Sequence, residues 1–142
     1  MYFAIKTYSF KKEERLKSRK LVETLFQDGK AFSLFPYRVI FMIAELPANA
    51  PAQAGFTVSS RKFPRAVDRN RIKRLGRECW RLHKSPLLQL LQEKQLQLAV
   101  FFIYTDKKIP EFTPLRHKFS LILNRLEKEI LKMSVEPGSS EI

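Results

Sequence analysis

Apolar residues near the start of the chain repeat with the period of an α-helix. Four of them are spaced to share one helix face: Leu21, Val22, Leu25 and Phe26. Ser18 is a suitable N-cap before them, and Gly29 is a typical residue just past a helix C-terminus. The pattern predicts a first helix that runs from Ser18 to Gly29 and packs by one side.

Three later segments have the composition of β-strands. Residues 37–46 are rich in β-branched and aromatic side chains, and Pro36 marks their start. After a surface turn at residues 47–53, residues 55–60 predict a returning antiparallel strand. Residues 96–105 are almost continuously apolar, which is typical of a central strand with both faces covered.

Three further helices are predicted in the second half of the chain. A basic helix begins between Pro64 and Ala66 and frays around Lys84, and residues 87–95 resemble a short extra helix after it. The last helix spans residues 113–133. Its apolar residues recur at helical spacing: Leu115, Phe119, Ile122, Leu126 and Ile130.

The order of these elements predicts an α+β fold, an α/β sandwich in which helices cover a small, mostly antiparallel sheet. A chain of 142 residues is the size of one domain and buries roughly two thirds of its unfolded surface. We assign residues 15–133 to this domain and residues 1–14 to an N-terminal extension. Residues 134–142 have little apolar content and are expected to form a flexible tail.

The basic helix carries the most informative pattern. Residues 61–84 contain ten basic side chains and only two acidic ones, Asp68 and Glu78. One apolar stripe is predicted to face the core: Ile72, Leu75, Cys79 and Leu82. The opposite side is basic apart from one amide: Asn70, Lys73, Arg74, Arg77 and Arg81. Arg69 with Trp80, and Arg71 with Glu78, lie on the flanks.

This distribution of charge favours an anionic partner over a simply solvated helix. A solvated helix face usually mixes acids with bases, because oppositely charged residues one turn apart attract each other. The outward positions here contain no acid, and guanidinium groups suit two-pronged contacts with phosphates. The sequence leaves open whether Trp80 stacks on a nucleic-acid base or shields the edge of the helix.

The whole chain is also strongly basic, with a formal net charge of +13 and a pI near 10.1. Such a charge indicates nucleic acid or an anionic membrane surface as the partner. No apolar run approaches the ~20 residues of a spanning helix. The N-terminal residues do not resemble a signal peptide, since their short apolar stretch precedes the charges. We therefore expect a cytoplasmic protein with no membrane partner.

Catalysis by the protein itself is not indicated. His83 and His117 have no carboxylate at a fixed spacing, and Asp68 and Glu78 fall on different faces of one helix. A single cysteine and two distant histidines cannot build a tetrahedral zinc site. Cys79 is expected to be a small hydrophobic residue of the core. We predict no catalytic residue, no protein-bound metal and no small-molecule substrate.

Residues 66–78, AVDRNRIKRLGRE, resemble the RNR motif of the bacterial ribonuclease P protein subunit. Upstream, residues 15–32 resemble the first helix of that family with its terminal glycine, and PYRVIFM resembles the strand that follows it. The segment FTVSSRKFPRAV then leads into the basic helix. The similarity covers about residues 15–132, and the spacing of these segments makes it a specific signal.

The resemblance implies a fold shared with a domain of a small-subunit ribosomal protein, with a left-handed βαβ crossover through the basic helix. It also implies that the partner, a catalytic RNA, hydrolyses precursor tRNA with magnesium and releases the 5′ leader. The protein would bind both RNAs without performing the cleavage.

Residues expected to meet the catalytic RNA lie on the basic helix and in the loop before it. They are Arg61, Lys62, Arg65, Arg69, Asn70, Arg71, Lys73, Arg74, Arg77 and Arg81. Arg61 and Lys62 stand where the family commonly has a lysine pair, and Pro64 replaces its glycine. The charge of the loop is thereby kept while its backbone is stiffer.

The leader is expected in a cleft between the first helix and the sheet, where family members carry aromatic residues. Phe26 matches one of these aromatics, while Val22 stands where many members have a second. Strand parity places Tyr37 and Ile40 on opposite faces of the sheet, and the sequence does not say which face meets RNA. Both residues are candidates for the cleft. The alternative is that Phe26 and the strand aromatics only complete the core.

Two other functions remain open from the residues alone. A non-catalytic RNA-binding protein of ribosome or ribonucleoprotein assembly would show the same basic helix. A DNA-binding protein would insert that helix into a major groove, but such helices usually follow a partner helix, and Asn70 is the only outward amide for reading adenine.

Overall fold

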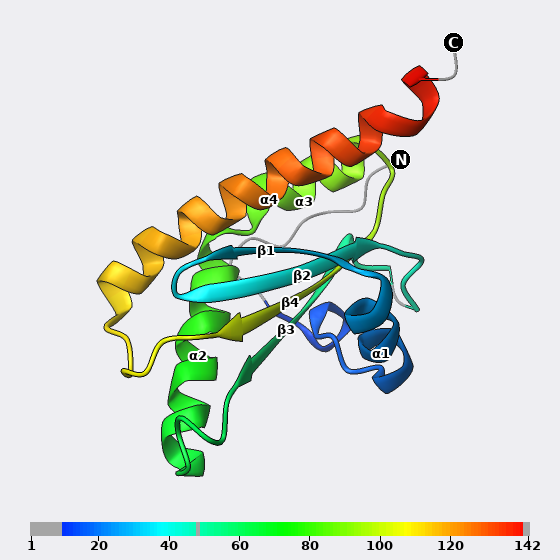
Figure 1. Ribbon diagram of the computed structural model, residues 1–142. Helices are drawn as coiled ribbons and strands as arrows, with labels where there is room; N and C mark the ends of the chain where they lie inside the picture. Colours follow the sequence, from blue (N-terminus) through cyan, green and yellow to red (C-terminus); the bar gives the residue numbers. More distant parts are fainter. Residues whose placement is uncertain (1–9, 48, 141–142) are drawn as a thin grey trace.

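The computed structural model of the chain describes residues 10–47 and 49–140. Its elements in chain order are η1 (Lys12–Glu14), α1 (Arg19–Asp28), β1 (Lys30–Leu34), β2 (Tyr37–Ile43), β3 (Ala52–Val58), α2 (Ala66–His83), α3 (Ser85–Glu93), β4 (Leu98–Tyr104) and α4 (Phe112–Ser140). Figure 1 shows the strands at the centre, with α3 and α4 on one side of the sheet and α1 on the other. The predicted α+β architecture is confirmed.

The four strands form one sheet in the order β1-β2-β4-β3. β2 pairs antiparallel with both β1 and β4, whereas β3 pairs parallel with β4. The sheet is thus mostly antiparallel, and β4 takes the inner position that its continuous apolar sequence predicts. The crossover from β3 to β4 runs through α2 and α3. Its handedness stays a prediction.

The predicted returning strand forms and runs antiparallel to β2, but it does not pair with β2. β3 covers Ala52–Val58 and lies beyond β4, so two strands that are consecutive in sequence are not neighbours in space. Because β4 is apolar on both faces, it buries more surface between two strands than it would at an edge. The sequence also missed β1, which is short and has one buried side chain, Phe32.

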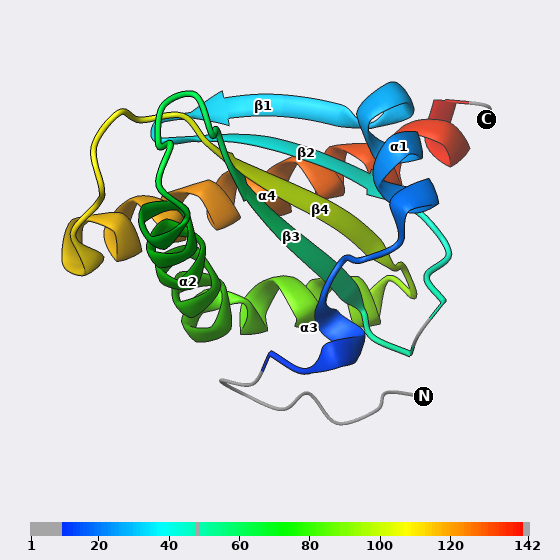
Figure 2. The same ribbon diagram turned by 90° about the horizontal axis from the view of Figure 1, so that it is seen from below.

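The two faces of the sheet carry cores of different size. One face packs against α2, α3 and α4, with the fully buried Phe102 in ring contact with Tyr37 and Phe119. On the other face, Leu25 of α1 packs in a smaller core with Ile40. Figure 2 shows α1 over one end of the strands, so the rest of this face has no helix above it. On this face Arg38 is exposed, and Phe101 and Ile103 are partly exposed.

Helix α1 begins and ends where its capping residues predict. The Ser18 side chain accepts a hydrogen bond from the Leu21 backbone N–H at 3.2 Å, and the Gly29 N–H donates to the Leu25 carbonyl at 2.8 Å. A Cβ at Gly29 would lie 2.4 Å from that carbonyl oxygen, so only glycine fits this close approach. Leu25 is the fully buried residue of the helix and fixes it on the sheet.

Helix α4 buries all five apolar residues that its spacing singled out, Leu115, Phe119, Ile122, Leu126 and Ile130. It also continues past the predicted end at residue 133, to Ser140. The predicted flexible tail, residues 134–142, therefore begins within a helix, and residues 141–142 lie outside the described part of the chain.

Candidate nucleic-acid interface

Helix α2 packs by one side, but the buried side is rotated relative to the prediction. The buried residues are Ile72, Gly76, Cys79 and Trp80. The predicted core residues Leu75 and Leu82 are only partly buried. The cause is Gly76, where an added Cβ would lie 2.9 Å from the Tyr37 hydroxyl and 3.0 Å from the Phe56 ring. Those rings approach the helix at its glycine, and this contact turns Trp80 inward.

Trp80 is a core residue and not a platform for a nucleic-acid base. Its side chain is 1% exposed, and its ring lies 5.8 Å from that of Phe102. Among the described residues, its indole Nε1 has no hydrogen-bond partner. The question that the sequence left open is therefore answered in favour of packing.

The opposite side of α2 is exposed and basic. It consists of Asn70, Arg71, Arg74 and Arg77, which we call the basic face. Arg71 is exposed although the sequence placed it on a flank, and Lys73 is half-buried at the edge of this face. The basic face contains no acidic residue. The two acids of α2 lie beside it in ion pairs, Asp68 with Arg65 and Glu78, whose side chain is 42% exposed, with Arg81. One cation per turn on a rigid helix is an arrangement suited to phosphate groups along a nucleic-acid backbone.

Three predicted RNA-binding residues lie in and just after the loop between β3 and α2. The Ser59 hydroxyl accepts hydrogen bonds from the backbone N–H groups of Arg61 and Lys62, at 3.2 and 3.3 Å. The Lys62 ammonium group donates to the Thr105 carbonyl at 2.6 Å, and Arg65 lies 3.7 Å from Asp68 in an exposed ion pair. The loop is thus ordered by its own contacts and keeps its cations at the surface.

Arg69 has a structural role that the sequence did not reveal. One nitrogen of its guanidinium group donates to the carbonyl oxygens of both Phe63 and Pro64, each at 2.8 Å. These bonds tie the first turn of α2 to the loop before it, and they use part of the donor capacity predicted for RNA. Arg69 therefore fixes the loop before α2 relative to the basic face.

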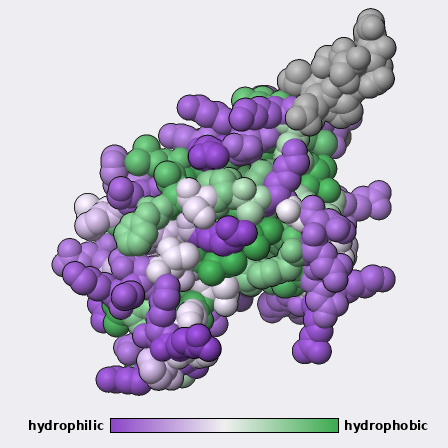
Figure 3. All heavy atoms as spheres, viewed as in Figure 1, coloured by the Kyte–Doolittle hydropathy of each residue, from purple (hydrophilic) through white to green (hydrophobic). Residues whose placement is uncertain are grey.

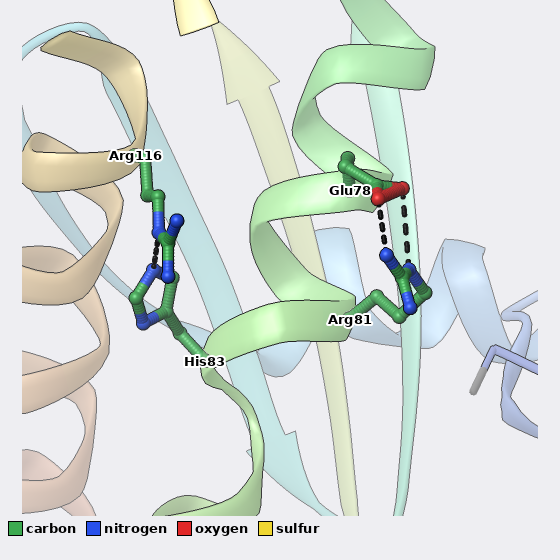
Figure 4. A network of polar contacts seen from close by, with 4 residues as sticks. All are labelled: Glu78, Arg81, His83 and Arg116. Atoms are coloured by element: carbon green, nitrogen blue, oxygen red, sulfur yellow. Dashed lines mark hydrogen bonds and ion pairs between the residues drawn. The ribbon is translucent and has the colours of Figure 1, made fainter. Parts of the chain in front are cut away.

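Arg81 is likewise engaged inside the protein. It forms an ion pair with Glu78 one turn earlier on α2, with its Nε 3.2 Å from a carboxylate oxygen (Figure 4). The hydrogen bond from Arg81 holds the pKa of Glu78 below its usual range. Arg81 is half-buried, so the prediction that it belongs to an acid-free outward face is wrong.

The candidate leader-binding surface centres on Phe26 and an aromatic residue that the sequence reading missed. The Phe26 side chain is 50% exposed, and its ring meets the edge of the Phe101 ring at 5.4 Å. Phe101 lies over Gly55 of the neighbouring strand, where a Cβ would approach its ring to 2.5 Å. Two partly exposed rings therefore stand side by side between α1 and the sheet. In Figure 3, apolar side chains gather over the sheet, bordered by hydrophilic ones.

The other two residues predicted for the leader cleft are buried. Tyr37 is 2% exposed and faces the opposite side of the sheet from Phe26, among the rings of Phe102 and Phe119. Burial raises the pKa of its hydroxyl well above the usual range. Ile40 does face α1 but is 6% exposed and packs in the core that contains Leu25. Strand parity was predicted correctly, but it could not tell which positions α1 covers.

Cys79 and His83 on α2 both have structural surroundings. Burial raises the pKa of the Cys79 thiol to about 12, so the thiol stays protonated and unreactive near neutral pH. His83 accepts a hydrogen bond from Arg116 at 2.9 Å, which joins the end of α2 to the start of α4 (Figure 4). Within residues 10–47 and 49–140, no three His, Cys, Asp or Glu side chains cluster as metal ligands would.

A search of the described residues for a helix long and apolar enough to cross a bilayer finds none. The fold and the basic face define the class of protein: a small α+β protein with a rigid, exposed cationic helix of the kind that suits a nucleic-acid backbone. The chain belongs to the ribonuclease P protein family, whose model, described as Ribonuclease P, matches residues 10–127.

Individual relatives agree with the family. The chain is 35% identical over 120 residues to the ribonuclease P protein component of Porphyromonas gingivalis, covering 84% of this chain and 88% of the relative. It is 33% identical over 128 residues to that of Chlorobium phaeobacteroides, covering 83% and 88%. The aligned regions cover most of the length of both relatives, so the resemblance seen in the sequence is confirmed.

Solved structures agree on the fold. The ribonuclease P protein of Staphylococcus aureus superposes with a TM-score of 0.64 at 21% identity, covering 81% of this chain and 96% of that one. The protein of Thermotoga maritima superposes with a TM-score of 0.59 at 25% identity, covering 79% and 96%.

Proposed function

We propose that this chain is the protein subunit of ribonuclease P, a ribonucleoprotein endonuclease of the cytoplasm that removes the 5′ leader from precursor tRNA. The basic face of α2 and the cationic loop before it bind the catalytic RNA subunit. The observation that carries this proposal is a helix fixed by four buried residues whose basic face presents three exposed arginines and no acidic residue. Family membership supplies the identity of the RNA.

The same proposal assigns the leader to the surface formed by Phe26 and Phe101. A base of single-stranded RNA can stack on an exposed ring, and stacking of this kind tolerates any base. Phe101 is held by its contact with Gly55, so the ring next to Phe26 is fixed in place. Binding of the leader here would position the precursor relative to the RNA subunit bound at α2.

Cleavage itself is assigned to the RNA subunit and its magnesium ions. The described part of the protein has no cluster of ligands for a divalent ion, and its buried thiol has a raised pKa. The protein's contribution is therefore to bind, orient and neutralise phosphates, and no step of the hydrolysis is assigned to its side chains.

Reconstitution with the RNA subunit from the same genome tests the proposal. The double variant Arg74→Ala with Arg77→Ala should fold normally, because both side chains are exposed, and should process precursor tRNA poorly at limiting protein concentration. A matched control is Lys118→Ala with Lys128→Ala on α4, which removes the same charge from another surface. Equal effects of the two pairs would mean that only net charge matters, and the proposed interface would be rejected.

A structural RNA-binding protein without a role in tRNA maturation is the alternative. It predicts that the chain, isolated from its native cell, carries ribosomal or assembly RNAs and that its RNA does not cleave precursor tRNA. Recovery of one dominant structured RNA with that cleavage activity supports the ribonuclease P assignment and excludes this alternative.

A further inference from the structure

The segment that precedes α1 is fixed against the main domain. The backbone N–H of Leu16 donates to the Ala54 carbonyl of β3 at 3.0 Å, and the Gln53 side chain donates to the Glu13 carbonyl at 2.9 Å. Figure 2 shows η1 beside the end of β3 that lies near α3. The backbone of this segment therefore has a defined position against β3, although the sequence suggested an extension as far as residue 14.

A buried ion pair locks this segment to the end of α2. The Lys84 ammonium group meets the Glu14 carboxylate, and the Lys84 side chain is 1% exposed while that of Glu14 is 16% exposed. The backbone of Lys84 joins the helices α2 and α3, since its N–H donates to the Trp80 carbonyl and its own carbonyl accepts from Leu88, both at 3.0 Å. The Lys84 ammonium group is therefore held at the junction of α2 and α3, and the segment that carries Glu14 must come to it.

A buried ion pair of this kind adds little to the free energy of unfolding, but it fixes the relative position of its two side chains. Removing two charges from water costs several kcal/mol, and well-packed apolar residues often replace a buried pair with equal or greater stability. A buried charge does, however, require its partner in one place, because leaving it unpaired is strongly unfavourable. The main effect of the Glu14–Lys84 pair is therefore to fix the position of the residues next to it.

The residue that it positions is Arg15, which follows Glu14 directly. The Arg15 side chain is exposed, its guanidinium carbon lies 5.4 Å from the centre of the Phe10 ring, and its Nη2 donates to the Phe10 carbonyl at 3.3 Å. The Lys84 ammonium group lies 6.0 Å from the same ring, and that ring contacts Phe56 at 6.4 Å. Arg15 is thus held by both the ring and the carbonyl of Phe10, and the Phe10 ring is itself packed against Phe56.

Arg15 stands close to the basic face. The Phe10 ring that Arg15 contacts packs on the Phe56 ring, and the Phe56 ring would lie 3.0 Å from a Cβ at Gly76, the neighbour of Arg77 on α2. Burial, and after it the charge of Arg15, lower the pKa of Arg77, in keeping with two cations near each other. Two like charges held near one another by other contacts are stabilised when an anion lies between or beside them. Glu78, the acidic neighbour of Arg77 on α2, is paired with Arg81, and the basic face itself contains no acidic residue.

We propose that Glu14 and Lys84 are positioning residues that hold Arg15 next to Arg77, so that Arg15 adds a phosphate contact to those of the basic face. The inference rests on the proposed function and extends the RNA interface from α2 onto the segment before α1. It assigns a role in RNA binding to two residues whose own side chains face the protein interior and not the RNA.

A double-mutant cycle on affinity for the RNA subunit tests this. Arg15→Ala should weaken binding about three- to tenfold and reduce the log-log salt slope by roughly 0.7 to 0.9, the value for one phosphate contact. Lys84→Met should produce the same two changes, because it releases the segment that carries Arg15. The double variant should bind no more weakly than either single variant. Effects that multiply in the double variant would overturn the proposal.

Folding must be separated from positioning, since Lys84→Met leaves a carboxylate partly buried. Glu14→Gln removes the charge at the more exposed end of the pair and keeps its shape, so it should fold and still lose part of the Arg15 effect. Exchanging the two residues, Glu14→Lys with Lys84→Glu, should restore the salt slope. A folded Glu14→Gln protein with unchanged affinity and slope would refute the positioning role.

Arg74→Ala separates this inference from the proposed function. If Arg74→Ala weakens RNA binding and Arg15→Ala does not, the positioning proposal alone fails. If neither variant changes affinity, the interface on α2 is wrong, and the positioning proposal fails with it. Lys128→Ala on α4 serves as the control for the loss of one surface charge.

Discussion

At the scale of single residues, Phe26 is where packing and RNA binding can be told apart. Half of its side chain is exposed, whereas Leu25 beside it is completely buried. The two neighbours on α1 therefore have different roles. Leu25 packs the helix onto the sheet, and Phe26 exposes a ring surface next to Phe101.

We predict that Phe26→Ala weakens binding of precursor tRNA to the reconstituted enzyme by about 1 to 3 kcal/mol, the contribution of one stacked base. Affinity for mature tRNA, which lacks the leader, should not change. The comparison requires both affinities and the melting temperature of the same variant. An equal loss for both RNAs, together with a lower melting temperature, would show that Phe26 only completes the core.

His83 gives the protein a dependence on pH through its burial and its contact with Arg116. Burial, and next the charge of Arg116, lower the pKa of His83 below its ordinary value. The neutral ring accepts the Arg116 hydrogen bond at Nε2. A histidine with a lowered folded pKa contributes stability that is complete above the unfolded value of about 6.5 and is lost as pH falls through the folded value.

We therefore expect the free energy of unfolding to decrease as the pH is lowered through the weakly acidic range. His83→Gln, which offers a carbonyl oxygen to Arg116 and does not titrate, should flatten this part of the profile. Chemical denaturation at several pH values provides the measurement, and His117→Gln is the matched control on an exposed histidine. A wild-type dependence that persists in His83→Gln must come from other groups.

At the scale of elements, α2 shows what periodicity can and cannot predict. The helix, its limits and its cationic side follow from residue spacing, and the structure confirms them. Its rotation does not follow, because a glycine counts as neutral in a hydrophobic pattern. Here Gly76 admits Tyr37 and Phe56, so Trp80 is buried while Leu75 stays at the margin of the core.

Gly76→Ala should therefore destabilise the protein, although alanine is the better helix former by about 1 kcal/mol. The new methyl group would enter space held by the buried Tyr37 ring and the partly buried Phe56 ring, and overpacking of this kind costs about 1 to 3 kcal/mol. Arg71→Ala on the exposed side of the same helix is the control and should stay within about 0.5 kcal/mol of the wild type. Urea unfolding of both variants decides the matter, since a gain in stability at Gly76 would contradict the close contact.

The strands show a second limit of sequence reasoning. Composition located β2, β3 and β4 but gave neither the pairing partner of β3 nor the position of α1 over the sheet. Pairing depends on which arrangement buries both faces of β4, a property of the whole molecule. For the same reason Tyr37 and Ile40 were assigned to a cleft, whereas Phe101, which has a similar local sequence, lies beside Phe26.

At the scale of the whole molecule, the cations that face solvent around α2 set the dependence of RNA binding on salt. Six of them remain exposed on the helix and its preceding loop: Arg61, Lys62, Arg65, Arg71, Arg74 and Arg77. With roughly 0.7 to 0.9 counterions released per phosphate, we predict a log-log slope of about −4 to −5 for binding of the catalytic RNA. Titrations at a series of salt concentrations measure it. A slope near −1 would rule out this surface as the main interface.

The parallel pairing of β3 with β4 also has a consequence for synthesis of the chain. β3 is made before α2 and α3, but β4, its partner strand, is made after both of them. Until β4 leaves the ribosome, the core side of α2 lacks Phe102 and the helix has no complete surface on which to dock. Contacts between distant parts of a chain form late in folding. A nascent chain therefore exposes its cationic helix before that helix has a fixed orientation, and selective binding of RNA becomes possible only once the last strand is in place.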